Sequence, residues 1–286
     1  VQRDVEGGRG DGNQHGVGSD GWNGKRRGYE HNPRGGRGNR FAAGPGMKVL
    51  GLDTSTSGCS AAVWDDGQLT VRRAAPMARG QAEALVPLAQ GVLAEAGVTF
   101  AGLDRVAVTV GPGAFTGLRI ALAAARGFAL AADVPVVGVT SFAAIAHALD
   151  PIERLGRRLL VAVESRRTEP YLQRFGAGLD PVGEPLLLDP AAVPAWLDGL
   201  DDESWAGQGG PLLVAGDGMA ALRPVLEGRG GVIFSTAPGI PDAASVAALG
   251  ALGEAGLPPV PLYLRAPDVT LPKNVPSPTA PSTGAA

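Results

Sequence analysis

The segment Val110–Arg119 reads V-G-P-G-A-F-T-G-L-R. Its first residue, Val110, is also the last residue of the apolar run Arg105–Val110. A short apolar run of this kind is typical of a buried strand, and the glycines and proline after it predict a tight turn. From about Thr116 to Ala132 the chain then has the composition of an apolar helix. A strand that enters a helix through a glycine turn is a unit of α/β folds. The sequence therefore predicts an α/β fold.

The residues around this unit predict a mixed sheet with helices on its faces. Three strands joined as an antiparallel meander are expected at Met47–Asp53, Ser60–Trp64 and Gln68–Ala75, with Asp65-Asp66-Gly67 as a hairpin turn. Apolar spacing predicts a helix over 81–96, with Gly97 as its C-terminal stop. A further strand is expected at 134–139, and Ser141 is a candidate N-cap for the helix after it.

A second region of strands and helices begins after Pro151. We expect strands at 159–164, 171–175, 185–188, 212–214 and 232–234, and helices at 191–197, 219–226 and 243–255. The chain is therefore divided into an N-terminal lobe at 47–150 and a C-terminal lobe at 151–271. The ends at 1–46 and 272–286 are expected to be disordered, the latter because it consists largely of Pro, Ser, Thr and Ala.

The first 46 residues contain 14 glycines and eight Lys or Arg against five Asp or Glu. Such a segment buries too little apolar surface to offset the entropy lost on ordering. Its Arg-Gly runs can bind RNA weakly. The interpretation that we prefer is a solvated tail, or sequence upstream of a true start at Met47.

The net charge, the single cysteine and the lengths of the apolar regions limit which kinds of protein this chain can be. The net charge is −3, which argues against a protein that grips nucleic acid through a broad basic face. The single cysteine, Cys59, excludes an intrachain disulfide. The longest apolar region, from Ile120 to Asp133, is interrupted by Arg126, so we expect no membrane span. A cytoplasmic location is the resulting expectation.

Two segments have the composition of phosphate-binding loops. Asp53-Thr54-Ser55-Thr56 ends the first strand with an acid and a run of hydroxyls, and Gly111, Gly113 and Thr116 lie in the strand-to-helix turn. Backbone amides at such a turn and at a helix start can bind an anion. A polar hairpin loop that satisfies its own backbone, and a tight strand-to-helix connection, explain the same residues without a ligand.

Four segments in fixed order resemble the TsaB family, also called YeaZ or glycoprotease-like. They are Asp53-Thr-Ser-Thr56, the nine-residue string Gly111–Arg119, Pro135–Val139 and Pro261-Leu-Tyr-Leu-Arg265. The resemblance covers roughly 47–272 and implies two lobes of the ASKHA type, the RNase H-like fold of actin and sugar kinases. It also implies a subunit without an active site of its own, which acts with TsaD and TsaE in threonylcarbamoyl transfer to N6 of the adenosine next to the anticodon of tRNA.

The sequence departs from the family in two places. Family members often carry a histidine near the start of the first helix, where this chain reads Arg79-Gly80-Gln81-Ala82-Glu83. Where members often read Asp-Ala-Arg before a strand with a tyrosine, this chain reads Glu164-Ser165-Arg166, and Tyr171 follows. The resemblance therefore implies no role for that histidine in this chain.

The helix over 116–132 carries small residues at every fourth position. Gly117, Ala121 and Ala125 form one such stripe, and Ala123, Gly127 and Ala131 form another. Small residues at this spacing allow close approach of a second helix, either within the lobe or from a partner. The family resemblance implies pairing with TsaD or with a second copy through this helix and the one before it. The expected interface residues are Leu85, Leu88, Gly117, Arg119, Ala121 and Ala125.

The sequence offers no set of catalytic or metal-binding residues. Its histidines are His15, His31 and His147, none of which is paired at metal-binding spacing, and Cys59 has no partner ligands. The turn at Val214–Met219 can be a relic of an adenosine site or a plain strand-to-helix turn. We expect no catalytic residue, no metal and no required cofactor, with ATP or ADP binding weakly at most through Asp53, Thr54, Ser55, Gly111, Gly113 and Thr116.

Three other functions remain open on the sequence. A stand-alone ATPase or small-molecule kinase of the same fold would use Asp53 and the glycine turn. A metalloprotease is suggested by the older family name, but the chain lacks a histidine pair for the metal. An RNA-binding module would act through the Arg-Gly segment.

Overall fold

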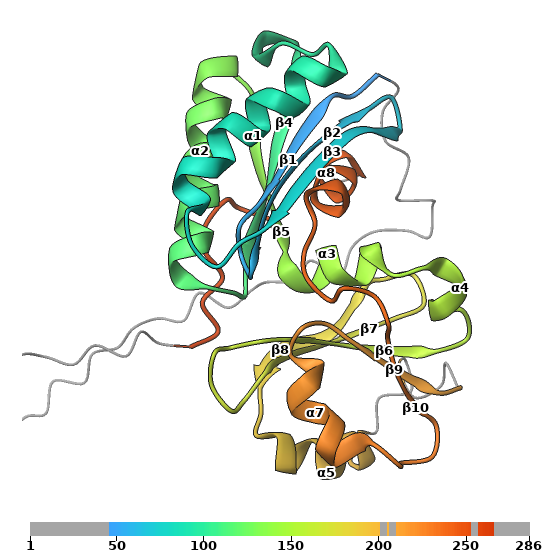
Figure 1. Cartoon of the computed structure of the whole chain (residues 1–286). Coiled ribbons are helices and arrows are strands. Elements are labelled where there is room, and N and C mark those ends of the chain that lie inside the picture. Colours follow the sequence, from blue (N-terminus) through green and yellow to red (C-terminus); the bar gives the residue numbers. More distant parts are fainter. Residues whose placement is uncertain (1–45, 201–204, 206–209, 253–256, 266–286) are drawn as a thin grey trace, which may run out of the picture. The chain divides into compact units, whose positions relative to one another are not determined.

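The computed structural model describes residues 46–200, 205, 210–252 and 257–265. The expected terminal segments therefore lie almost wholly outside the described residues. The first sheet has five strands in the order β3-β2-β1-β4-β5 (Figure 1). Strand β1 pairs antiparallel with β2 and parallel with β4. The strands are β1 (Val49–Asp53), β2 (Gly58–Asp65), β3 (Gln68–Pro76), β4 (Arg105–Gly111) and β5 (Val136–Thr140).

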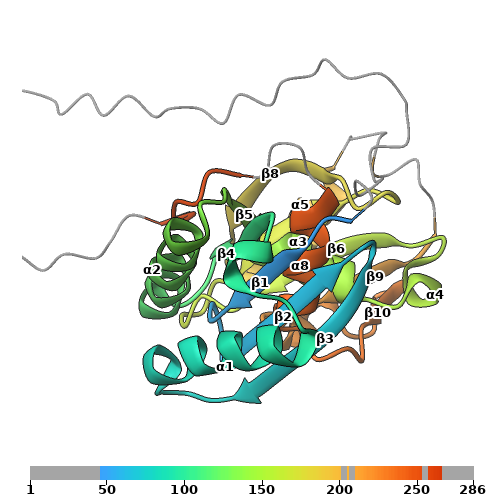
Figure 2. The ribbon, with the colours of Figure 1, turned by 90° about the horizontal axis from the view of Figure 1, so that it is seen from above.

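Helices cover both faces of the first sheet (Figure 2). Helices α1 (Gln81–Ala96) and α2 (Phe115–Ala132) share a core with Leu50 and Leu52 of β1. Helix α8 (Ala243–Leu252) shares another core with Val49. Successive side chains of a strand point to opposite faces, so α8 lies on the face opposite α1 and α2. A short 3-10 turn, η1 (Phe100–Gly102), precedes β4.

The position of helix α8 does not follow the expected division of the chain into lobes at residue 151. It belongs by sequence to the region 151–271, yet it packs on β1 and β4 of the first sheet. Seven of its ten residues are buried, as expected for a helix that is apolar on every side. Gly51 permits this contact, because a Cβ atom there would lie 2.3 Å from the carbonyl oxygen of Ala243.

The second sheet repeats the strand pattern of the first, in the order β10-β9-β6-β7-β8. Its strands are β6 (Arg158–Val163), β7 (Tyr171–Phe175), β8 (Pro181–Leu187), β9 (Leu212–Ala215) and β10 (Val232–Phe234). Strand β6 pairs antiparallel with β7 and parallel with β9, as β1 does with β2 and β4. Two lobes with the same mixed topology confirm the predicted α/β fold.

Shorter helices flank the second sheet. They are α3 (Ser141–Ala148), α4 (Pro151–Arg154), the 3-10 turn η2 (Pro190–Ala192), α5 (Val193–Asp198) and α7 (Met219–Leu226). Phe142 and Ile145 of α3 pack on one face of the sheet. Leu222 of α7 and Trp205 pack on the other. The N-cap of α3 is Thr140 rather than the expected Ser141, since the Thr140 side chain accepts a hydrogen bond from the amide of Ala143.

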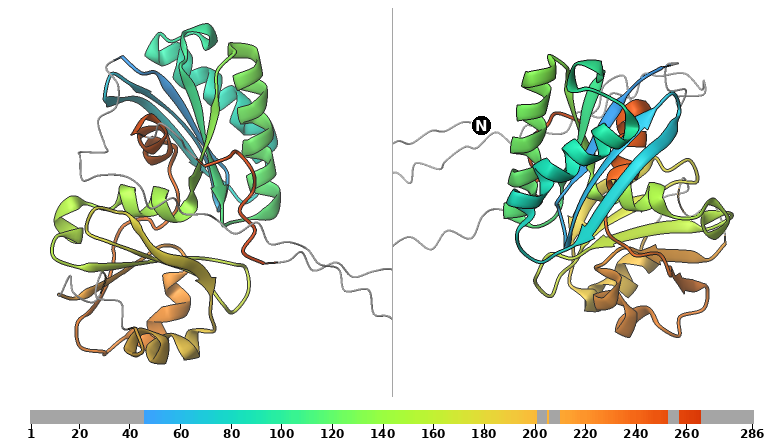
Figure 3. Two further views of the ribbon diagram at one scale, coloured as in Figure 1. Left: turned by 180° about the vertical axis from the view of Figure 1, so that it is seen from behind. Right: turned by 45° about the horizontal axis from the view of Figure 1, so that its top comes forward.

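The segment Leu257–Arg265 returns to the first lobe, as the chain drawn in red in Figure 3 shows. Gly138 of β5 donates its amide to the Leu257 carbonyl oxygen at 2.7 Å. The amide of Leu262 donates to the carbonyl oxygen of Val110 at 2.7 Å. The end of the family-like region is thereby fixed beside the glycine turn that precedes α2.

Helix α2 is, among the described residues, the one helix with the length and composition of a membrane span. Its face formed by Leu118, Leu122 and Ala125 is buried in the core against the first sheet. Core helices of globular units pass the same test of length and composition, so the property alone does not indicate a membrane.

Candidate functional site

The two segments with the composition of phosphate loops are packed directly against each other. The Thr54 hydroxyl donates to the Gly117 carbonyl oxygen at 2.7 Å, and the Ala114 amide donates to the Ser55 carbonyl oxygen at 2.7 Å. A Cβ atom would lie 2.3 Å from the Ser55 oxygen if added to Gly113, and 2.0 Å from the Thr54 oxygen if added to Gly117. These two glycines therefore serve close packing of the backbone, which leaves no space for a phosphate between the two segments.

Asp53 ends β1 in a buried position with 1% of its surface exposed. Its Oδ1 atom accepts hydrogen bonds from the Ser55 hydroxyl at 2.6 Å and from the Ser55 amide at 3.1 Å. Burial raises the pKa of Asp53 to about 6, and the Ser55 hydroxyl opposes that shift. The Oδ1 atom of Asp53 is thus held by its own loop.

The six expected nucleotide-binding residues do not line a common cavity. Thr54 and Thr116 line a cavity of about 570 Å³, which we call the first cavity. Asp53 lines a second cavity of about 310 Å³. Gly113 lines a third of about 240 Å³. Ser55 and Gly111 are buried and lie in the lining of none of these three.

The second cavity lies where β1 and β2 meet the segment before α8. The Ser60 hydroxyl accepts a hydrogen bond from the Ala243 amide at 3.0 Å. Asp242 accepts a hydrogen bond from the amide of Ala244 at 2.9 Å and forms an ion pair with Arg72. Burial raises the pKa of the Cys59 thiol to about 11, with the charge of the Asp53 carboxylate as the smaller cause. The polar contacts beside this cavity hold the start of α8 to the sheet.

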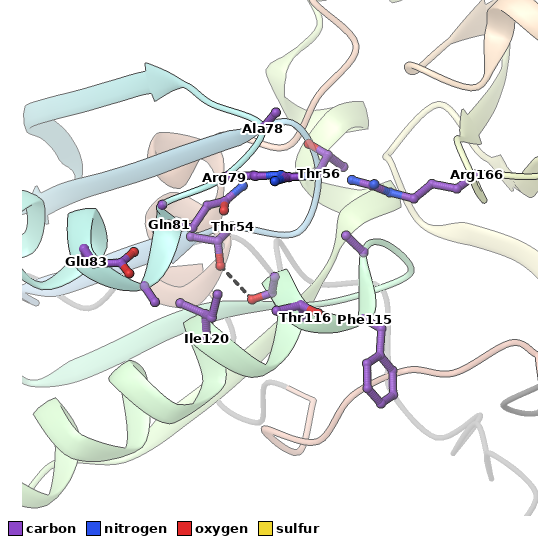
Figure 4. A pocket seen from close by; sticks show the side chains of 14 residues that line it. Thr54, Thr56, Ala78, Arg79, Gln81, Glu83, Phe115, Thr116, Ile120 and Arg166 are labelled. Carbon is purple, nitrogen blue, oxygen red and sulfur yellow. Dashed lines mark hydrogen bonds between the residues drawn. The ribbon is translucent and has the colours of Figure 1, made fainter. Parts of the chain in front are cut away.

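The first cavity is bounded by three parts of the chain (Figure 4). The loop after β1 contributes Thr54 and Thr56, and the second lobe contributes Arg166. The rest of the lining comes from the residues that begin α1 and α2, at 78–83 and 114–117, with Ile120. In the sequence, Arg79 and Arg166 stand out only by their places in family motifs. Their meeting at one cavity depends on how the two lobes pack, which no local spacing reveals.

Most of the expected interface residues are buried within the first lobe. Leu85, Ala121 and Ala125 have no exposed surface, because they face the core on the sheet. Gly117 is also buried, whereas Leu88 is half-buried and Arg119 is exposed. The first small-residue stripe therefore packs inside the lobe. The second stripe, Ala123, Gly127 and Ala131, is exposed.

An aromatic cluster that the sequence did not predict lies beside the glycine turn. The rings of Phe115 and Tyr263 stack with centroids 5.6 Å apart. The guanidinium carbon of Arg119 lies 3.7 Å from the Phe115 ring centroid, and its Nε donates to the Tyr263 hydroxyl at 3.3 Å. The family-like strings at 111–119 and 261–265 thus meet in space. Their separation in the chain concealed this contact.

The turn Val214–Met219 has a structural explanation. A Cβ atom on Gly216 would lie 1.9 Å from the Ala162 carbonyl oxygen, so glycine permits contact with β6. Asp217 accepts a hydrogen bond from the Glu164 amide at 2.8 Å. Burial raises the pKa of Asp217, mainly by desolvation of its charged form. These contacts join the turn to the hairpin between β6 and β7.

His147 contacts a hydroxyl, and no metal cluster surrounds it in the described part of the chain. Its Nδ1 lies 3.2 Å from the Ser245 hydroxyl oxygen. Burial lowers the pKa of His147, and the charge of Arg154 lowers it further. Across the described ranges, no three His, Cys, Asp or Glu side chains lie close enough to hold a metal ion.

Comparison with known proteins finds relatives named for threonylcarbamoyladenosine in tRNA. The family model for TsaD, tRNA N6-adenosine threonylcarbamoyltransferase, matches residues 76–211. The tRNA threonylcarbamoyladenosine biosynthesis protein TsaB of Escherichia coli K12 is 32% identical over 130 residues, which are 45% of this chain. That alignment spans 55% of the E. coli protein, so the chain spans about half the length of this relative.

Two further comparisons extend over nearly whole proteins. A Mycobacterium tuberculosis H37Rv protein described as uncharacterised, Rv3421c, is 35% identical over 222 residues, which are 77% of this chain and 92% of that protein. The solved structure of YeaZ from Pseudomonas aeruginosa has a TM-score of 0.63 and 28% identity, and the match covers 76% of this chain and 100% of that one. Because the match to TsaB is supported by both sequence and fold, the chain belongs to the TsaB (YeaZ) family.

Proposed function

We propose that the chain takes part in the biosynthesis of threonylcarbamoyladenosine in tRNA. The observation that carries the proposal is membership of the TsaB family, in which the E. coli and Haemophilus influenzae relatives are named for that biosynthesis. Within this role, the chain is a subunit that pairs with TsaD and acts with TsaE, with no active site of its own. Its substrate RNA is bound through the complex, in the cytoplasm.

The exposed face of α2 supports pairing through that helix. Ala123, Gly127 and Ala131 form its small-residue stripe, and Leu130 beside them is 85% exposed. A Cβ atom on Gly127 would meet nothing within 4 Å. Small and apolar side chains on one exposed helix face allow a second helix to approach closely. A partner helix, from TsaD or from a second copy related by a two-fold axis, would cover this stripe.

Reconstitution tests the proposal. TsaD, TsaE, threonylcarbamoyl-adenylate, ATP and tRNA are incubated with and without this chain, and modified adenosine is counted by mass spectrometry. We expect modification to depend on the chain, while the chain alone does not hydrolyse ATP. Equal modification without the chain would remove it from this biosynthesis. ATP turnover by the chain alone, lost in Asp53→Ala, would instead favour the stand-alone ATPase.

A matched pair of variants tests the interface. Ala123 and Ala220 are both exposed alanines in helices, on α2 and α7 respectively. Ala123→Arg places a charged side chain on the stripe and is expected to abolish co-purification with TsaD and the dependent modification. Ala220→Arg makes the same chemical change on the second lobe and is expected to preserve both. Equal behaviour of the two variants would exclude the exposed face of α2 as the pairing surface.

A further inference from the structure

Two aromatic side chains beside the start of α2 are exposed and stacked on each other. Phe115 is 47% exposed and Tyr263 is 44% exposed, and their ring centroids lie 5.6 Å apart. Val260, close to Tyr263 in the chain, is 54% exposed. Figure 4 shows the Phe115 ring pointing away from the first cavity. Large apolar side chains that are exposed together mark an interaction surface, and here they present ring faces to a ligand.

Two arginines of α2 hold this pair against the helix through uncharged partners. The guanidinium carbon of Arg119 lies 3.7 Å from the Phe115 ring centroid, and its Nε donates to the Tyr263 hydroxyl at 3.3 Å. Arg126 donates to the Pro259 carbonyl oxygen at 2.7 Å. A ring, a hydroxyl and a carbonyl leave the positive charge of both arginines uncompensated. These exposed residues form one surface, which we call the aromatic ridge: Phe115, Arg119, Arg126, Val260 and Tyr263.

The aromatic ridge is basic, although the chain from Met47 onward is acidic. Without the eight basic and five acidic residues of 1–46, the chain has 17 basic and 23 acidic residues and a net charge of −6. Helix α2 and the segment 257–265 nevertheless contain no acidic residue, and together they carry Arg119, Arg126 and Arg265. A local concentration of arginines on an acidic chain favours a negatively charged ligand at this one place.

The third cavity shares two residues with the aromatic ridge and has room for a planar group. Phe115, Tyr171 and Tyr263 supply its aromatic lining, and Arg265 lies at the same cavity. Its volume of about 240 Å³ is below the about 300–1,000 Å³ of pockets for drug-sized ligands, so it suits a single ring system. Glu164 is the one acid among the described lining residues, and its carboxylate can accept a hydrogen bond from an amino group of a base.

We propose that the aromatic ridge binds single-stranded RNA, with one unpaired base stacked on Tyr263 at the third cavity. Unpaired bases stack on aromatic side chains, and arginines beside them bind the backbone of the same strand. The exposed rings and the uncompensated arginines supply both kinds of contact on one surface. An acidic protein segment would match the charge alone, whereas RNA matches the charge and the rings, because every base has a planar face.

The inference deepens the proposed function, because it names the part of this chain that contacts RNA. It rests on that function only for the choice of tRNA as the RNA. The aromatic ridge lies beside the stripe Ala123, Gly127 and Ala131 on α2, so RNA and a partner helix would lie next to each other. RNA binding by the chain and the need for the chain in the modification are separate measurements, so either can fail while the other holds.

Fluorescence anisotropy of the full chain with a labelled anticodon stem–loop of unmodified tRNA tests the proposal. We expect saturable binding that Tyr263→Leu weakens about fivefold or more, because leucine keeps an apolar contact but has no ring on which a base can stack. Tyr263→Phe keeps the ring and should bind within about twofold of the parent. An RNA duplex of the same length has no unpaired base and should bind more weakly than the stem–loop.

A matched pair of arginine variants separates the aromatic ridge from a general effect of charge. Arg223 on α7 lies 4.3 Å from the Phe234 ring centroid, much as Arg119 lies over Phe115. Arg119→Gln should weaken RNA binding and reduce the slope of log affinity against log salt by about 0.7, the value for one phosphate contact on a single strand. Arg223→Gln should change neither quantity. Circular dichroism establishes that each variant is folded.

Photocrosslinking locates the RNA on the chain. A stem–loop with 4-thiouridine in its loop should crosslink to peptides that contain Phe115 or Tyr263, as identified by mass spectrometry. Affinity that Tyr263→Leu leaves unchanged, equal effects of Arg119→Gln and Arg223→Gln, or crosslinks confined to the residues before Met47 would each overturn the proposal. If the modification depends on the chain but no RNA crosslinks to the aromatic ridge, the proposed function stands and the RNA site is refuted.

Discussion

The hydroxyl of Thr54 donates a 2.7 Å hydrogen bond to the carbonyl oxygen of Gly117, 63 residues further along the chain. The bond is buried and joins the loop after β1 to the first turn of α2. The Ala114 amide adds a second bond, to the Ser55 carbonyl oxygen. The loop and the glycine turn therefore behave as one structural unit, and the position of α2 depends on it.

This unit makes Gly117 intolerant of a side chain. In Gly117→Ala the new Cβ would lie 2.0 Å from the Thr54 carbonyl oxygen, a backbone atom that cannot turn away. We expect a loss of about 3 kcal/mol or more in the free energy of unfolding, typical of overpacking against a rigid neighbour. Gly127→Ala in the same helix meets nothing within 4 Å and should gain about 0.5–1 kcal/mol. Urea denaturation of both variants measures the difference, and similar stabilities would contradict the close contact.

Local sequence patterns predicted the elements well, because turns and periodicity are local. The helix expected at 81–96 is α1 with those bounds, and the strand expected at Tyr171–Phe175 is β7. The sequence could not show which of the two small-residue stripes of α2 is buried. Glycine and alanine occur both in cores and on surfaces, so their presence does not indicate burial. The sequence also could not predict which sheet α8 packs on, because a helix that is apolar on every side has no single core-facing side.

The candidate site was less predictable than the fold, for a physical reason. Glycine serves both close backbone approach and anion binding, so the string at 111–119 could not distinguish the two roles. Arg79 and Arg166 come from different lobes, and their distance along the chain gives no signal of a shared cavity. In the sequence Thr56 is one of several hydroxyl residues, and the lack of a partner for its Oγ1 atom among the described residues is a property of the packed structure.

Asp242 holds the start of α8 in two ways. It accepts a hydrogen bond from the Ala244 amide at 2.9 Å, and it binds Arg72 of β3 through an ion pair. Asp242→Ala removes both contacts and should lower the free energy of unfolding by about 1–2 kcal/mol, mainly through the lost cap. Asp242→Asn keeps the cap acceptor and should lose less than half of that. Thermal unfolding of the two variants ranks them, and equal losses would assign the effect to the ion pair instead.

Tyr263 fixes the segment Leu257–Arg265 beside α2. Its ring stacks on Phe115, and its hydroxyl accepts a hydrogen bond from Arg119. Tyr263→Ala should cost about 1 kcal/mol, as expected for an aromatic pair at the surface, and should increase proteolysis within 257–265. Leu130→Ala is a suitable control on the same helix, because Leu130 is 85% exposed. If both variants are cleaved at the same rate, the stack does not hold the segment.

The buried carboxyl group of Asp53 gives a stability that depends on pH. Burial raises the pKa from its ordinary value of 3.8 to about 6, so between these values the folded chain holds a proton that the unfolded chain has released. The free energy of unfolding therefore falls as pH rises from about 4 to about 6, by an amount on the order of 3 kcal/mol from this group. Asp53→Asn keeps an oxygen that can accept from Ser55, and it removes the titration.

Two comparisons test this origin of the pH dependence. Asp53→Asn should flatten the stability profile from pH 4 to 6 and should be more stable than the parent at pH 7.5, where the parent buries a charged carboxylate. Asp180→Asn changes an exposed aspartate and should leave the profile unaltered. Denaturant titrations at each pH give the slope directly. A profile that keeps its slope in Asp53→Asn would show that another group is responsible, and a variant less stable than the parent at pH 7.5 would show that the hydrogen bonds to Ser55 outweigh the cost of burying the charge.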